Sequence, residues 1–81
     1  MRLDKYLKVT RIIKRRTVAN EACDAGKVLV NGKIARASYD VKLGDVLEIQ
    51  LGSRLIKAEV LIVSEYAKKE DVGAMYNIIS D

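Results

Sequence analysis

The change of hydrophobic period near residue 28 limits the possible folds of this 81-residue chain more than any other feature. Before it, apolar residues recur at the i, i+1, i+4, i+5 spacing of a buried helix stripe, at Val18, Ala19, Ala22 and Cys23. After it, apolar and polar residues alternate, as in half-buried strands. Asn31-Gly32 favours a type I′ hairpin turn, because such a turn needs a positive φ at both positions. Helices followed by antiparallel strands predict an α+β fold.

Two helices are expected before this change of period. Residues 2–9 predict a short amphipathic helix whose buried side consists of Leu3, Tyr6 and Leu7. A second helix is predicted to begin near Arg16 and to end at Gly26, because glycine readily takes the left-handed conformation that follows a helix. We therefore expect two helices packed on a small antiparallel sheet.

The sheet is expected to contain the hairpin strands around Asn31-Gly32 and two longer strands. In residues 46–51 the side chains on one face are Leu47, Ile49 and Leu51. In residues 55–63 the inward side chains are predicted to be Ile56, Ala58, Val60 and Ile62. For the tail we predict a short helix around Lys68–Ala74, followed by extended chain.

Length and composition indicate a single domain, residues 1–81, with one modest core. No apolar run approaches the roughly 18 residues that a membrane helix needs, and the charged N-terminus does not resemble a signal peptide. The single cysteine, Cys23, has no partner for an internal disulfide and is expected to be a buried packing residue. We expect a cytoplasmic monomer without membrane contact.

Positive charge is concentrated in the first half of the chain. Residues 1–36 contain ten Lys and Arg and three Asp and Glu (10 − 3 = +7), whereas residues 37–81 contain five and eight (5 − 8 = −3). Segregation of this kind is typical of proteins that bind nucleic acid. The alternative is a basic surface that only faces water.

The residues needed for common catalytic sites are missing. The chain has no histidine, which excludes Ser-His-Asp and Cys-His arrangements, and one cysteine without histidine makes no structural zinc site. No glycine-rich phosphate loop is present. We therefore predict a binding protein with no enzymatic activity, metal or cofactor.

Thirteen residues are candidates for RNA contact. The main set surrounds the first helix and the start of the second, and consists of Arg2, Lys5, Lys8, Arg11, Lys14, Arg15, Arg16, Thr17 and Asn20. A peripheral set lies on or near the hairpin, and consists of Lys27, Asn31, Lys33 and Arg36. Arg16 is the first choice, because a guanidinium at a helix N-terminus can join free backbone N–H groups in holding a phosphate. With four tyrosines and no Phe or Trp, recognition of RNA shape and phosphate is expected rather than base stacking.

The segments "RLDKYL", "RRTVAN", "AGKVLVNGK", "SYDV" and "KLGD" resemble, in order and spacing, the signature of the S4 RNA-binding domain. The resemblance covers residues 2–50 and implies the αL motif, in which two N-terminal helices and a small sheet bind RNA. Residues 51–81 would complete the sheet. Many S4 domains have a capping serine just before the second-helix arginine, where this chain has Arg15. The missing cap costs on the order of 1 kcal/mol, so Arg15 is expected to have a compensating anionic contact.

Within that family, "KVTRIIKRRT" and "AMYNII" resemble the stand-alone RqcP group, which is related to small heat-shock S4 proteins. This resemblance implies binding to 23S rRNA of the free large ribosomal subunit and to peptidyl-tRNA. It also implies support of an RqcH-like factor that adds alanine to stalled chains. Three alternatives remain open: an rRNA-binding assembly or heat-stress factor, a detached domain of an RNA-modifying enzyme, and a protein-binding adaptor.

Overall fold

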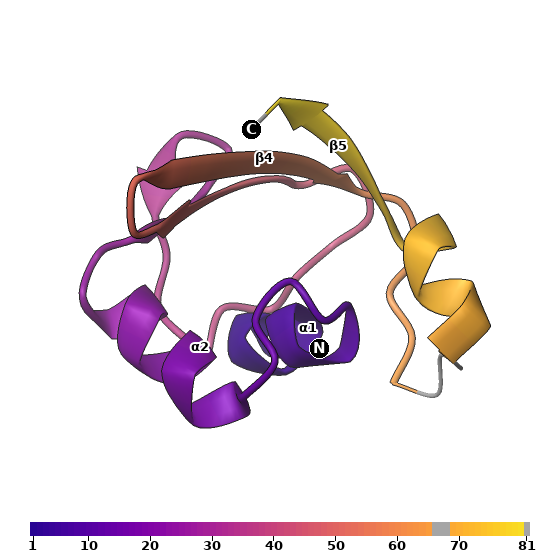
Figure 1. The fold of residues 1–81 in the computed structure, drawn as a ribbon, viewed down its shortest axis with the longest axis horizontal. Helices are drawn as coiled ribbons and strands as arrows, with labels where there is room; N and C mark the ends of the chain where they lie inside the picture. Colours follow the sequence, from indigo (N-terminus) through magenta and orange to yellow (C-terminus); the bar gives the residue numbers. More distant parts are fainter. Residues whose placement is uncertain (66–68, 81) are drawn as a thin grey trace.

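Two helices lie on one face of a five-stranded antiparallel sheet (Figure 1). The computed structural model of the protein describes residues 1–65 and 69–80. Its helices are α1 (Leu3–Val9), α2 (Arg16–Asp24) and the short 3-10 helix η1 (Lys69–Ala74). Its strands are β1 (Val28–Val30), β2 (Lys33–Ile34), β3 (Val46–Leu51), β4 (Arg54–Val60) and β5 (Tyr76–Ser80). The predicted α+β architecture is confirmed.

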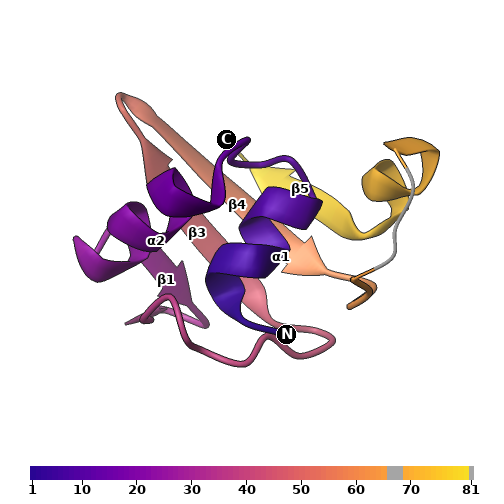
Figure 2. The same ribbon diagram turned by 90° about the horizontal axis from the view of Figure 1, so that it is seen from below.

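The strands follow the order β2-β1-β3-β4-β5, and every neighbouring pair is antiparallel. In the central pair, Leu47 lies opposite Ala58 and Ile49 opposite Ile56. These are residues predicted to face inward, and all are buried or partly buried. Figure 2 shows α1 and α2 across the inner face of the strands.

The predicted hairpin turn between β1 and β2 is confirmed. Asn31 has φ 52° and Gly32 has φ 83°, the positive values that a type I′ turn requires. Gly26, with φ 77°, ends α2 as expected. Both predictions depend on the backbone chemistry of one or two residues, which the sequence shows directly.

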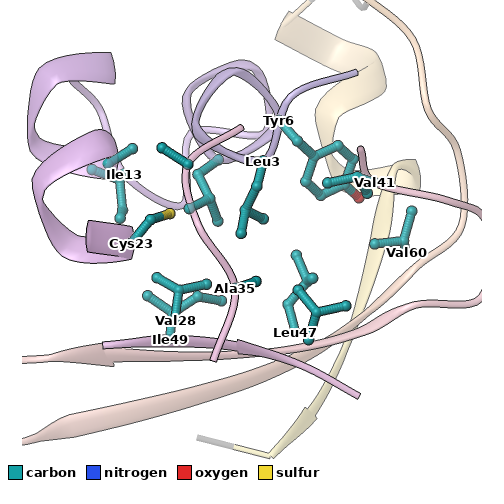
Figure 3. Close-up of a cluster of buried hydrophobic side chains, with 14 of the residues drawn as sticks. Leu3, Tyr6, Ile13, Cys23, Val28, Ala35, Val41, Leu47, Ile49 and Val60 are labelled. Carbon is teal, nitrogen blue, oxygen red and sulfur yellow. The ribbon is translucent and has the colours of Figure 1, made fainter. Parts of the chain in front are cut away.

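The core fills the space between the helices and the sheet (Figure 3). Leu3 and Tyr6 reach it from α1, and Cys23 reaches it from α2. The Tyr6 hydroxyl donates a hydrogen bond of 2.8 Å to the Met75 carbonyl oxygen, which connects α1 to the chain just before β5. The core therefore holds α1 against the C-terminal part of the sheet.

Two predictions of burial are wrong. Val18 is 45% exposed, because α2 packs through the narrower stripe of Ala19 and Cys23. Ile62 is 44% exposed, because β4 ends at Val60. The backbone N–H groups of Leu61 and Ile62 both donate to the Met75 carbonyl oxygen, which is incompatible with the alternation of a continuing strand.

The C-terminal segment forms the short helix and the extended chain that were predicted. η1 begins at Lys69, β5 pairs with β4, and Lys68 lies outside the described residues. In the described part of the chain, no helix combines the length and hydropathy that crossing a bilayer requires.

Replacing Cys23 with serine should lower the free energy of unfolding by about 1–3 kcal/mol, because it puts a hydroxyl among apolar side chains. The Cys23 side chain is buried, and burial raises its pKa to about 11, so the thiol is protonated at neutral pH. Thermal melts and RNA-binding assays of the variant check this. Lost binding with unchanged stability would contradict a packing role.

Candidate RNA-binding surface

The main set of predicted RNA contacts lies on α1, on the loop to α2 and on the first turns of α2, which pack side by side (Figure 2). We call this set the helix surface, defined by Arg2, Lys5, Lys8, Arg11, Lys14, Arg15, Arg16, Thr17 and Asn20. All its members are exposed except Lys5 and Asn20, which are partly buried. The structure thus brings these residues together without burying their charges.

Asp4 joins the two helices beneath this surface. Its side chain is 3% exposed, and its Oδ1 accepts hydrogen bonds from Arg2 Nε at 3.2 Å and from the Lys5 backbone N–H at 2.8 Å. Its Oδ2 accepts a hydrogen bond from Asn20 Nδ2 at 3.2 Å and lies 3.4 Å from Arg16 Nε. One buried carboxylate therefore contacts both Arg2 and Arg16, the first choice for phosphate contact from the sequence.

The protonation state of Asp4 follows from these contacts. Burial raises the pKa of its carboxyl, but hydrogen bonds from Arg2, Asn20 and Arg16 outweigh burial and hold the pKa below its ordinary value. Asp4 is therefore ionised at neutral pH, and it offsets one of the two guanidinium charges beside it.

Lys5 has a distant acidic partner that the sequence does not reveal. Its Nζ donates a hydrogen bond of 2.8 Å to Glu65 Oε1, in the segment after β4. This hydrogen bond and the lysine charge lower the pKa of the Glu65 carboxyl. Lys5 is therefore less available for RNA than those cations of the helix surface that have no acidic partner among the described residues.

Arg11 lies beyond the end of the first helix. α1 ends at Val9 with Thr10 as its C-cap, and Arg11 takes the left-handed conformation with φ 61°. The left-handed conformation is favourable for glycine, whereas any other residue raises the conformational energy there by roughly 1–2 kcal/mol. Arg11 is exposed at this position, so its guanidinium is accessible to solvent despite the strained backbone.

Among the side chains that the structure describes, in residues 1–65 and 72–79, none pairs with four cations of the helix surface, Lys8, Arg11, Lys14 and Arg15. Arg15 is the N-cap of α2 and its side chain makes no capping hydrogen bond, as expected for a chain that lacks the serine. Its anionic contact remains a prediction. These four charges, together with the guanidinium charge that Asp4 does not offset, leave the surface positive.

Replacing Arg11 with glycine and with alanine separates backbone strain from charge. Both variants lose the same guanidinium, so each should lower the slope of log K against log salt by about 0.7–0.9. The glycine variant should be about 1 kcal/mol more stable than the alanine variant, because glycine lacks the Cβ that clashes at this φ. Denaturant titrations and RNA-binding assays check this. Equal stabilities would show that the helix end is unstrained, and unchanged slopes would remove Arg11 from the RNA contacts.

The peripheral candidates lie on and beside the hairpin. Lys27, Lys33 and Arg36 are exposed, and the last two border a depression of about 660 Å³ together with Tyr39. The Asn31 side chain is exposed and also makes two hydrogen bonds within the protein. Its Nδ2 donates to Asp45 Oδ1 at 3.0 Å, and its Oδ1 accepts the Val46 backbone N–H at 2.9 Å.

Asp4 and Asp45 are the residues that the sequence prediction missed. Each is a nearly buried carboxylate that organises the polar groups around it. For Asp4 a signal was present, because positions 3, 4 and 7 share one side of a helix and Asp4 therefore lies beside Leu3 and Leu7. An acid on the apolar side of a helix indicates a buried cationic or hydrogen-bonded partner.

What this arrangement can do chemically is bind anions. A depression of about 360 Å³ on the helix surface is bordered by Asp4, Arg16, Thr17, Asn20 and Glu21. In the described residues no three His, Cys, Asp or Glu side chains cluster as metal ligands would. The exposed guanidinium and ammonium groups match phosphate oxygens in charge and in hydrogen bonding.

An α+β domain with two basic N-terminal helices against a small sheet is the arrangement of an S4 RNA-binding domain, and the S4 domain family model matches residues 1–47. The chain is 54% identical to the RQC P-site tRNA stabilizing factor of Streptococcus pneumoniae, over the whole chain and 92% of that protein. It is 47% identical to the factor of the same name from Bacillus subtilis, over the whole chain and 94% of that protein. The chain belongs to the S4 domain family, in the group that contains these stabilizing factors.

A solved structure supports the same fold. Heat Shock Protein 15 of Vibrio cholerae, described as trimeric, superposes with a TM-score of 0.90 at 26% sequence identity. The match covers 99% of this chain and 82% of the Vibrio chain. The resemblance to the RqcP group and to small heat-shock S4 proteins is thereby confirmed.

Proposed function

We propose that this protein binds 23S rRNA of the free large ribosomal subunit together with peptidyl-tRNA, and that it stabilises the P-site tRNA while stalled chains are tailed. The observation that carries the proposal is the 54% identity, over the whole chain, to a relative named for stabilising P-site tRNA. The relatives are named as stabilizing factors rather than enzymes, and this protein too is proposed to act by binding alone.

The helix surface supplies the means of binding. Its cations lie on or next to two short helices and on the loop between them, and the core and Asp4 hold the two helices together before RNA arrives. Preorganised phosphate contacts position an RNA backbone without reading its bases. A tRNA held in this way would stay in place while an RqcH-like partner extends the nascent chain with alanine.

We propose that residues 1–81 act as one domain. Residues 2–50 would carry the RNA contacts, and residues 51–81 would support them through β4, β5 and the Lys5–Glu65 ion pair. The proposed location is the cytoplasm, where ribosomes are. Sedimentation equilibrium of the purified protein distinguishes the expected monomer from a trimer like that described for the Vibrio relative.

The second candidate function is that of a heat-stress or assembly factor that binds rRNA without a role in tailing. The likeness to the Vibrio heat shock protein favours it. It accounts less well for the match over the whole chain to the pneumococcal stabilizing factor, at about twice the sequence identity.

Deleting the gene in its host and complementing the deletion decides between these functions. Nascent chains arrested on a non-stop message are analysed for alanine tails by mass spectrometry. Loss of tails in the deletion, with recovery by the wild-type gene, supports the proposal. Tails that persist in the deletion would exclude the tailing role and favour the assembly or heat-stress function.

A further inference from the structure

The buried carboxylate of Asp4 contacts Arg2, Arg16 and Asn20 of the helix surface through both of its oxygens. Arg2 donates through Nε to Oδ1 and, at 3.4 Å, through an Nη to Oδ2. Arg16 Nε lies 3.4 Å from Oδ2, the oxygen that also accepts from Asn20. Two guanidinium groups that begin different helices are therefore held against one carboxylate.

The two guanidinium groups keep donors free on their outer sides. A guanidinium has five N–H donors in a rigid planar fork. The Arg16 contact uses its Nε, and the Arg16 side chain is 46% exposed. The Arg2 side chain is 50% exposed, whereas that of Asp4 is 3% exposed. The buried carboxylate thus uses the inner donors and leaves outer donors directed at solvent.

We propose that Asp4 is a positioning residue that orients Arg2 and Arg16 so that their outer N–H groups receive one RNA backbone phosphate. The inference rests on the proposed function, since it concerns the same surface. An arginine that is already oriented loses less side-chain entropy when it binds. Asp4 therefore strengthens phosphate binding, although its own charge repels phosphate.

This role and simple electrostatics predict opposite signs for one substitution. Asp4→Asn is nearly isosteric and raises the formal net charge of +4 by one, so a diffuse electrostatic surface would bind RNA equally well or more tightly. If Asp4 positions the arginines, binding should weaken by about tenfold, because the variant loses the carboxylate charge and one of the two oxygens that accept N–H hydrogen bonds, and an NH2 group takes that oxygen's place. Asp24→Asn, an exposed acid on α2, is the matched control for charge and should bind no more weakly than wild type.

The assay uses purified large ribosomal subunits and fluorescently labelled protein, at a temperature where circular dichroism shows each variant to be folded. A double-mutant cycle of Asp4→Asn and Arg16→Ala measures the coupling between the two residues, which would be absent if Asp4 only stabilised the fold. Arg16→Ala should cost much less affinity in the Asp4→Asn background than in wild type, because Arg16 is already unoriented there. Equal costs in the two backgrounds would overturn the inference.

Two other outcomes are decisive. If Asp4→Asn does not fold, Asn20→Ala replaces it, since this variant removes one donor to Oδ2 without changing any charge. Because Asn20 is itself a candidate for RNA contact, the readout is again the double-mutant cycle: Arg16→Ala should cost less affinity in the Asn20→Ala background than in wild type, and equal costs would overturn the inference. If Arg16→Ala has no effect even in wild type, the helix surface is not the RNA contact and the proposed function fails instead.

Discussion

Replacing Arg16 with alanine should weaken binding to large ribosomal subunits by about ten- to a hundredfold, or roughly 1.5–3 kcal/mol. Arg16 begins α2 and is half exposed, with its Nε held at Asp4. A guanidinium oriented in this way makes charge-assisted hydrogen bonds to phosphate, and its loss removes those bonds together with the charge. Equilibrium binding of labelled protein at constant salt measures the effect.

Lys33→Ala is the control for this experiment. Lys33 carries the same charge, but it is exposed on β2 and has no ion-pair partner among the described residues. Its loss should remove no more than one diffuse phosphate contact and should cost much less affinity. If the two variants lose the same affinity, binding depends on a generally basic surface rather than on the helix surface.

Raising the salt concentration from 50 to 200 mM should weaken binding by about 10²- to 10³-fold. The helix surface offers about four to six phosphate contacts, from Lys8, Arg11, Lys14, Arg15 and the two arginines at Asp4. Each contact releases counterions, so log K should fall against log salt with a slope of roughly −0.7 to −0.9 per contact. A titration series at fixed temperature and pH measures this slope. A flat dependence would be incompatible with recognition of the phosphate backbone.

Features that depend on one or two neighbouring residues were predictable from the sequence. The Asn31-Gly32 turn and the end of α2 at Gly26 follow from which residues accept a positive φ. Burial of Tyr6 and Cys23 follows from helical periodicity. The positions of the cations were equally predictable, because a charged residue in a short helix or loop seldom leaves the surface.

Features that depend on where distant segments meet were not predictable. Lys5 pairs with Glu65, 60 residues away, and Asp4 meets Asn20 only because α1 and α2 pack together. The exposure of Val18 and Ile62 depends on where a helix stripe narrows and where a strand ends. Periodicity carries no information about either.

The candidate site shows the same division. The sequence indicates which residues are basic, but it does not distinguish Arg2 and Arg16, which are held at Asp4, from Lys8 and Arg15, which have no acidic partner among the described residues. It also does not show that Asn31, an RNA candidate, makes two hydrogen bonds within the protein, and the RNA contact of this exposed side chain stays a prediction. Tertiary contacts decide which polar groups remain available.

Sedimentation of a tagged copy expressed at its natural level tests the proposed role most directly. Lysates of cells with stalled translation are separated on a sucrose gradient, and the tRNA content of each fraction that contains the tagged protein is measured. The protein should sediment with free large subunits that carry peptidyl-tRNA, and Arg16→Ala should move it to the top of the gradient. Wild-type protein that stays at the top, or that sediments with large subunits lacking tRNA, would contradict a role in stabilising the P-site tRNA.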